Sequence, residues 1–242
     1  MMNRFVRLLL AIVLLMNFNS YSYAAKGAAS VYKITITKVE LCETGSTISN
    51  CLNPDDITVG GGVADVDIAA VTAGEAAGVV ADFSRLTPGK TYTYLQAILK
   101  REMKISGVAD GCYTENDGVY NANDGRAVGS TSSSDQAEVS LFVPYFSQND
   151  SFLMIEGSSD ASGTSLAEAG EIRSTDTHFR SRQVLSSSYT HKVGISPTVF
   201  LAFDTSLGVE DDQIYTGSPG TCGSDETLGA APPTQTITIQ GQ

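Results

Sequence analysis

The side chains that most often act as catalytic bases or nucleophiles are scarce in this sequence. It holds two histidines, His178 and His191, which are 13 residues apart and cannot form an i, i+4 metal-ligand pair. The G-x-S-x-G turn that exposes the nucleophile of many serine hydrolases is absent. Both histidines lie among Ser, Thr and Arg, so we expect them on the surface and predict no catalytic residue.

Carboxylates are plentiful, with 27 Asp and Glu in the chain. Two of them at the right separation could act as the acid and base of a glycoside hydrolase, so their number alone does not dismiss that reaction. Glycosidases usually also hold sugar rings against aromatic side chains, and this chain has no Trp. Because the acids lie mainly in polar segments, we interpret them as solvated surface charge.

Two acidic segments offer the oxygen ligands that Ca²⁺ prefers, residues 116–125 and the group of Asp204 with residues 210–212. In the first, Tyr120 and Ala122 occupy positions where the D-x-[DN]-x-[DN]-G loop needs oxygen ligands. Asn-Gly and Asp-Gly steps also form turns without a metal. We therefore predict loops and neither metal nor cofactor, with calcium as the alternative in both segments.

The four cysteines predict two disulfides, because an even number in an exported chain is typical of an oxidising compartment. Their spacing matches no zinc site and includes no C-x-x-C motif. Four cysteines permit three pairings. Cys42 and Cys51 flank a short polar loop, which favours a local bridge and leaves Cys112 to pair with Cys222.

The first 24 residues have the three parts of a secretory signal peptide. Arg4 and Arg7 precede an apolar run over residues 8–16, which is shorter than the roughly 20 residues that span a bilayer. Small residues stand at −3 and −1 of a cut after Ala24. We predict removal of residues 1–24, with an uncleaved anchor as the alternative. No later segment reaches membrane-spanning length, so the mature protein is expected to be secreted, periplasmic or on a bacterial cell surface.

The charge of the chain excludes two classes of partner. The formal net charge is −12 at pH 7, and loss of Arg4 and Arg7 makes it −12 − 2 = −14. Such a surface repels nucleic acids and anionic lipids. It favours solubility and basic or cationic partners.

Alternating apolar residues predict an all-β fold. In residues 31–41 every second side chain is apolar, and the parity changes near Lys38, which indicates a bulge or a twist. Residues 92–105 form the longest strand-like region, whereas residues 107–136 are interpreted as a long surface loop. Many short strands separated by turns predict a β-sandwich, prealbumin- or Ig-like, with long polar loops. We expect residues 25–110 to form this module and residues 111–242 a second β-rich part packed with it.

The chain ends in a strand-like segment that follows a stiff Pro232-Pro233 spacer. Such a strand can close its own sheet, which is the default, or complete the sheet of a second copy and build a head-to-tail filament. It carries no charged side chain. In the second case the assembly residues would be Thr234, Thr236, Ile237, Thr238 and Ile239.

Two segments carry a resemblance to a known family. Residues 86–95, with the sequence LTPGKTYTYL, resemble a hairpin of prealbumin-like modules, which include bacterial adhesin B-repeats and DUF4382-like exported domains. Residues 33–41, with the sequence KITITKVEL, are similar to the opening strand of such domains. The resemblance covers residues 30–107 and implies an extracellular β-sandwich without catalysis.

These observations predict a secreted or cell-surface structural protein that is not an enzyme. Its partner would be further copies of itself, bound through the terminal strand. The alternative is an extracellular binding module, an adhesin or a carbohydrate-binding domain, whose partner would be a surface glycan. A hydrolase with an unrecognised site is the third and smallest option.

Overall fold

A computed structural model describes residues 25–60, 62–70, 81–116, 126–143, 154–158, 176–195, 197–212, 222, 227–231 and 233–240. The expected signal peptide and most of the first calcium candidate lie outside these residues. Helical structure within them is limited to two three-residue 3-10 turns, Phe83–Arg85 and Ser133–Asp135. The described chain is therefore all-β, as its sequence predicts.

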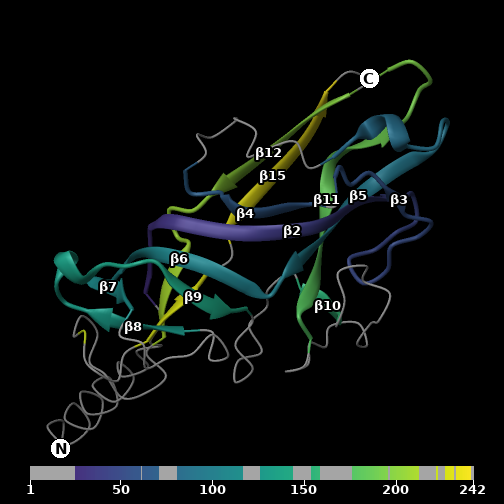
Figure 1. Cartoon of the computed structure of the whole chain (residues 1–242). Helices are drawn as coiled ribbons and strands as arrows, with labels where there is room; N and C mark the ends of the chain where they lie inside the picture. Colours follow the sequence, from purple (N-terminus) through teal and green to yellow (C-terminus); the bar gives the residue numbers. More distant parts are fainter. Residues whose placement is uncertain are drawn as a thin grey trace, which may run out of the picture.

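Fifteen strands are described, and Figure 1 shows their arrangement. They are β1 (Lys26–Gly27), β2 (Ala29–Glu43), β3 (Asp55–Asp56), β4 (Val63–Asp67), β5 (Thr91–Lys100), β6 (Glu102–Ala109), β7 (Cys112–Glu115), β8 (Arg126–Ser130), β9 (Val139–Phe142), β10 (Met154–Ser158), β11 (His178–Thr190), β12 (Thr198–Asp204), β13 (Val209–Asp212), β14 (Thr227–Ala230) and β15 (Thr234–Gln240).

Thirteen of these strands belong to one antiparallel sheet, in the order β1-β13-β14-β8-β7-β6-β2-β5-β11-β10. Strands β3 and β4 pair with β2, and β9 pairs with β6. Strands β12 and β15 form a separate pair that runs across the main sheet (Figure 1). Strand β7 pairs with β6, and β11 pairs with β5. Strands from both sides of the expected boundary at residue 110 therefore belong to one sheet.

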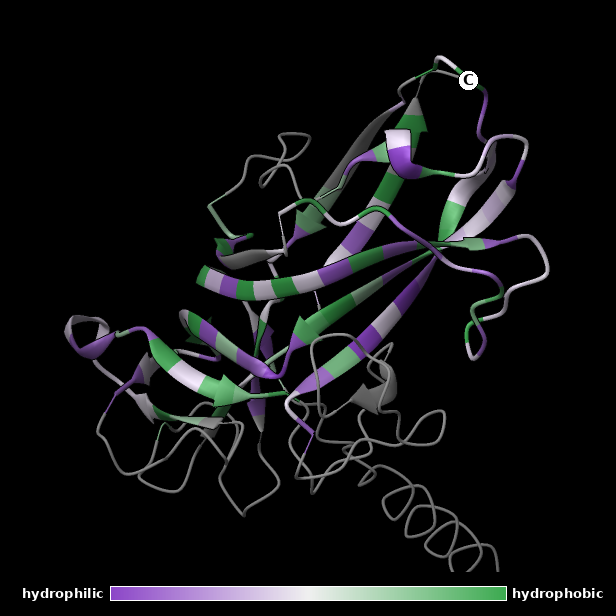
Figure 2. Cartoon of the chain, turned by 45° about the vertical axis from the view of Figure 1, so that its right-hand side comes forward, coloured by the Kyte–Doolittle hydropathy of each residue, from purple (hydrophilic) through white to green (hydrophobic). Residues whose placement is uncertain are grey.

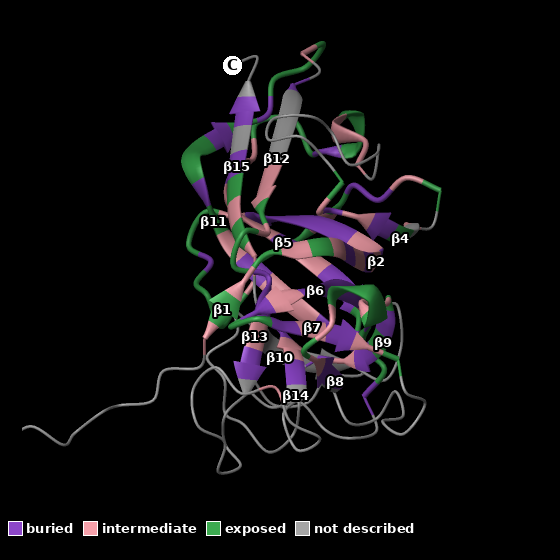
Figure 3. Cartoon of the chain, turned by 90° about the vertical axis from the view of Figure 1, so that its left-hand side faces the viewer, coloured by how far each residue is buried: buried purple, intermediate pink, exposed green. Residues whose placement is uncertain are grey.

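The parity change predicted in the first long strand is present in β2. Its pairing with β5 shifts register between Ile36 and Lys38, so that Ile36 and Val39 are both buried although their positions differ in parity. Figure 2 shows the alternation of hydrophobic and hydrophilic residues along the strands, and Figure 3 shows the burial that accompanies it. The largest fully buried side chains of the core are Tyr32, Tyr92 and Tyr189.

The region predicted as one strand over residues 92–105 is divided at Arg101, which separates β5 from β6. Arg101 is 2% exposed, and its guanidinium donates hydrogen bonds to the carbonyls of Val143 and Asp176. The two strands follow one another along the same edge of β2. A buried cation with these fixed partners explains the break, which side-chain parity alone does not reveal.

The long surface loop expected over residues 107–136 is also corrected by the structure. Its described residues include the end of β6, all of β7 and all of β8, and these strands continue the main sheet. The acidic loop expected at residues 210–212 is instead part of β13, which pairs with β14 and β1. In both segments the backbone hydrogen bonds of neighbouring strands outweigh a polar, turn-like composition.

Candidate functional site

Both histidines are buried, which contradicts the surface position expected from their neighbours. His178 begins β11, and its Nδ1 lies 2.8 Å from the hydroxyl of Thr177. His191 follows the end of β11, and its Nδ1 lies 3.1 Å from the hydroxyl of Tyr189. Because they lie at opposite ends of a 13-residue strand, roughly 30–40 Å long, they cannot share a site.

Two acidic residues of the second calcium candidate bond to a backbone amide and to a lysine of a neighbouring strand. Asp204 Oδ1 accepts a hydrogen bond of 2.9 Å from the amide of Ser206, and Glu210 forms an ion pair of 3.6 Å with Lys26. Within the described part of the chain, no three His, Cys, Asp or Glu side chains are grouped so as to hold a metal ion. Residues 117–125 of the first candidate lie outside the described residues.

The four cysteines form the two disulfides expected from the sequence. Cys42 at the end of β2 is bonded to Cys51, with their Cα atoms 5.1 Å apart. Cys112 at the start of β7 is bonded to Cys222, with their Cα atoms 5.4 Å apart. The second bridge connects segments separated by 110 residues.

A polar corner joins β3 to the start of β5 and holds a partly buried carboxylate. Asp55 accepts hydrogen bonds from the Tyr92 hydroxyl, the Lys90 ammonium at 2.8 Å and the Thr87 amide at 2.8 Å. Burial alone raises the pKa of Asp55, but these bonds outweigh it and lower the pKa to about 2. Burial, and next the bond to Asp55, raise the pKa of Tyr92.

This corner predicts a specific acid sensitivity. An ionised Asp55 has a folded pKa of about 2, below its ordinary 3.8, so its stabilisation is complete above that ordinary value and is lost as the pH falls from about 4 to 2. Between about pH 4 and pH 2 the Asp55→Asn variant should lose less free energy of unfolding than the unmutated chain. We expect the difference to be on the order of 1–2 kcal/mol, after allowance for solvent screening. Denaturant titrations at several pH values measure this.

Asp110→Asn provides the control, because Asp110 is an exposed residue in the turn between β6 and β7 and Asn tolerates its positive φ of 48°. We expect that variant to lose as much free energy of unfolding between those pH values as the unmutated chain does. An equally reduced loss in both variants would contradict the role given to Asp55.

A second polar group, the buried ladder, crosses three neighbouring strands. Glu40 of β2 lies opposite Gln96 of β5, which lies opposite Arg182 of β11. Their exposed fractions are 5%, 2% and 2%. The amide of Gln96 donates to Glu40 and accepts from Arg182, so one neutral side chain links the acid to the base.

The ends of the buried ladder are also anchored. Lys38 forms an ion pair of 2.6 Å with Glu40, and Arg182 donates to the carbonyl of Ile48 at 3.1 Å. Ile48 lies in the loop that Cys42 and Cys51 close, so this loop covers the ladder. Gln96 stands between Leu95 and Ala97 in β5, yet it is buried more deeply than either of them.

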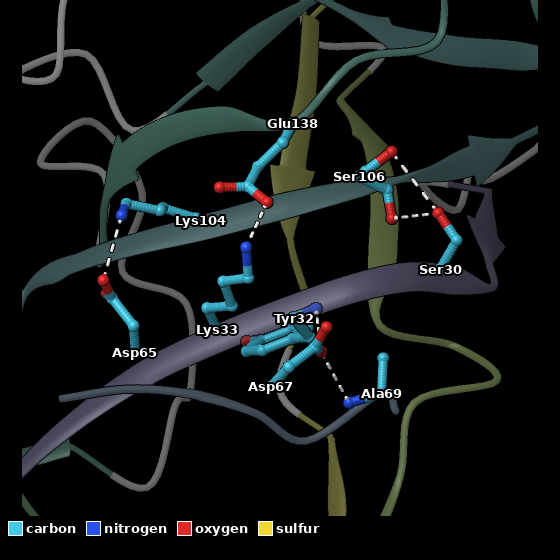
Figure 4. A network of polar contacts seen from close by, with 9 residues as sticks. All are labelled: Ser30, Tyr32, Lys33, Asp65, Asp67, Ala69, Lys104, Ser106 and Glu138. Carbon is cyan, nitrogen blue, oxygen red and sulfur yellow. Dashed lines mark hydrogen bonds and ion pairs between the residues drawn. The ribbon is translucent and has the colours of Figure 1, made fainter. Parts of the chain in front are cut away.

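Lysines and acids form ion pairs on an exposed part of the main sheet (Figure 4). Lys33 of β2 pairs with Glu138, and Lys104 of β6 pairs with Asp65 at 3.1 Å. Exposed pairs of this kind contribute little to the free energy of unfolding, because water and salt screen the charges. The further bonds of this network join Asp67 to the amides of Tyr32 and Ala69, and Ser30 to Ser106.

The terminal strand, β15, pairs with β12 of the same chain over seven residue pairs in an unbroken antiparallel register. Ile237 and Ile239 are buried, whereas Thr234 and Thr236 are exposed. The side chains of β15 therefore alternate between a buried and an exposed face, as in a strand with one face toward the core. The pairing is the intramolecular one that was the default.

Comparisons of the chain with protein-family models, curated proteins and solved structures found no match. The resemblance to prealbumin-like modules over residues 30–107 stays a prediction. Within the described residues, no helix has the length and apolar character needed to cross a bilayer.

Proposed function

We propose that this chain is an exported, non-catalytic structural protein whose copies assemble by exchanging their terminal strands. Two disulfides support a location in an oxidising compartment outside the cytoplasm. The polar clusters described above hold strands and turns together, and this supports a structural role rather than a catalytic one. The observation that carries the proposal is the separate pairing of β15 with β12.

Strand β15 lacks the sequence features that protect the edge of a sheet. Proteins usually blunt such edges with charged side chains, proline, bulges or a cover. Thr234–Gln240 contains no charge, no proline and no bulge, and within the described residues its only ladder partner is β12. The outer edge of β15 has no described strand partner, so a second chain could approach it.

The segment before β15 is anchored at Ala231. Its amide donates a hydrogen bond of 3.0 Å to the carbonyl of Gly208, and its carbonyl accepts a hydrogen bond of 3.1 Å from the hydroxyl of Tyr32. The Pro232-Pro233 spacer begins directly after this anchor. This anchor can therefore stay in place while β15 exchanges, provided that the β15 of a second copy fills the core positions of Ile237 and Ile239. The same seven-residue ladder can form again with β12 of the next copy, and such a head-to-tail contact need not close into a ring.

Cysteines placed across the β12–β15 ladder test the exchange. Ala202 lies directly opposite Thr236, at a separation that suits a disulfide. One preparation of the mature chain carries Ala202→Cys and another carries Thr236→Cys. After the two are mixed and oxidised, exchange predicts a covalent two-chain product joined between positions 202 and 236, identified by non-reducing peptide mapping.

Thr234→Cys mixed with Ala202→Cys is the matched control, because Thr234 is also an exposed threonine of β15 but lies opposite Asp204. We expect much less product from this pair. A chain carrying both Ala202→Cys and Thr236→Cys should lock as a monomer when oxidised and assemble when reduced. Monomers alone at high concentration, without any 202–236 product between chains, would refute the proposal.

A further inference from the structure

The chain is fixed in place immediately after the expected cut. In β1, Lys26 lies opposite Glu210 and Gly27 opposite Val209, both in β13. The amide of Asp211 donates a hydrogen bond of 2.8 Å to the carbonyl of Ala25. Ala25, the first residue of the expected mature chain, therefore continues this ladder opposite Asp211.

Close packing also holds β1 against β6. A Cβ atom at Gly27 would lie 1.9 Å from the carbonyl oxygen of Val108, so only glycine fits there. The amide of Val108 also donates to the carbonyl of Ala28 at 3.1 Å. These contacts give the backbone at Ala25 a defined position.

Asp211 is a buried acid next to that position. Its exposed fraction is 1%, and it lies on the same face of β13 as the buried Val209. Side chains directly opposite each other in an antiparallel pair have Cβ atoms about 4.5–5.5 Å apart. Ala25 and Asp211 are therefore neighbours across the β1–β13 pairing, and a chain that begins at Ala25 would place its terminal nitrogen on the strand beside Asp211.

We propose that Asp211 is the binding site for the α-ammonium group that signal-peptide cleavage creates at Ala25. A peptidase would break the Ala24–Ala25 bond with water, which adds hydroxyl to the Ala24 carbonyl and hydrogen to the Ala25 nitrogen. The new carboxylic acid of Ala24 releases its proton at neutral pH and the new amine takes one up, so that a neutral amide is replaced by a cation beside a buried carboxylate. The ion pair fastens β1 to β13. The inference rests on export with cleavage after Ala24. It makes processing a step that stabilises the fold.

The test compares mature chains that differ only in the charge of the terminus. One sample begins with a free amine at Ala25 and the other with an N-acetyl group. Charge-assisted hydrogen bonds predict that acetylation raises the equilibrium constant for unfolding about tenfold or more, measured by denaturant titration. In Asp211→Asn chains, acetylation should change that constant little.

Glu210→Gln is the matched control, because it removes an adjacent acid that already pairs with Lys26 and should leave the acetylation effect intact. An acetylation effect that is absent, or that is equal in the unmutated and the Asp211→Asn chains, would overturn the proposal. If the Asp211→Asn chain does not fold, the α-amino pKa of the unmutated chain decides. It should lie above the ordinary range of about 7.7–8.0, because the acids Asp211 and Glu210 of β13 outnumber the neighbouring cation Lys26, and an unshifted value would overturn the site.

These chains have chemically defined ends, so failure of the ammonium site is distinct from failure of export. Sequencing the N-terminus of the exported protein tests the cut itself. The strand-exchange crosslink tests assembly independently of both.

Discussion

Replacing Cys112 and Cys222 together by alanine is expected to lower the free energy of unfolding by about 4–5 kcal/mol. The bridge closes a loop of 110 residues, and a crosslink of that length removes much of the conformational freedom of the unfolded chain. Cys112 is 1% exposed, so alanine avoids placing a new hydroxyl group in the core. Guanidinium unfolding of the mature chain, with all other cysteines oxidised, measures the loss.

The Cys42 and Cys51 double alanine variant is the matched control. Its bridge spans only nine residues, and the same chain-entropy argument gives it about 2–3 kcal/mol. The long-range bridge should therefore cost about 2 kcal/mol more to remove. An equal loss in both variants, or a larger loss from the short loop, would contradict the entropic account of the long bridge.

Much of the strand content could be predicted from the sequence, because alternation is a local property of a strand. The bulge near Lys38 is a good example, since a change in parity requires an extra residue in the ladder. The terminal strand is another, because two isoleucines alternating with threonines define a buried and an exposed face. The composition of the loop between Cys42 and Cys51 was likewise enough to suggest a local bridge.

The burial of polar residues could not be predicted in the same way, because burial depends on segments that are distant in sequence. His178 begins β11 and His191 follows its end, and their neighbours in sequence are mostly polar, so nothing local indicates that both are buried. Asp211 was expected in a solvated loop. Its position is set by β1, which pairs from the other end of the chain.

The buried ladder was missed for a related reason. Glu40 and Gln96 are separated by 56 residues, and Gln96 and Arg182 by 86 residues. Only the register of three strands places the three side chains in one row. A glutamine among the apolar residues of the longest strand-like region of the sequence was the available signal, since an uncharged polar residue is rarely buried without partners.

Removing the acid from the buried ladder is the second change for which we expect a large effect. Glu40→Leu leaves the Arg182 guanidinium and the Gln96 amide buried without the carboxylate at the end of their row. Breaking a directly bonded buried pair by removing one member costs about 3–5 kcal/mol, because the other charge keeps its desolvation penalty. Since Gln96 lies between Glu40 and Arg182, we expect the lower end of this range. Denaturant unfolding of the mature chain should report a loss in this range.

The comparison that isolates this cause replaces the whole buried ladder with apolar side chains of similar size. Such replacements of buried ionic groups are often neutral or stabilising, because no polar group is left without a partner. The triple variant Glu40→Leu, Gln96→Leu and Arg182→Met should therefore recover most of the stability that Glu40→Leu loses. Lys38, which is partly exposed, can then turn its ammonium group to water. A triple variant as unstable as the single one would mean that leucine at position 40 disturbs packing, and that the charge of Arg182 does not set the cost.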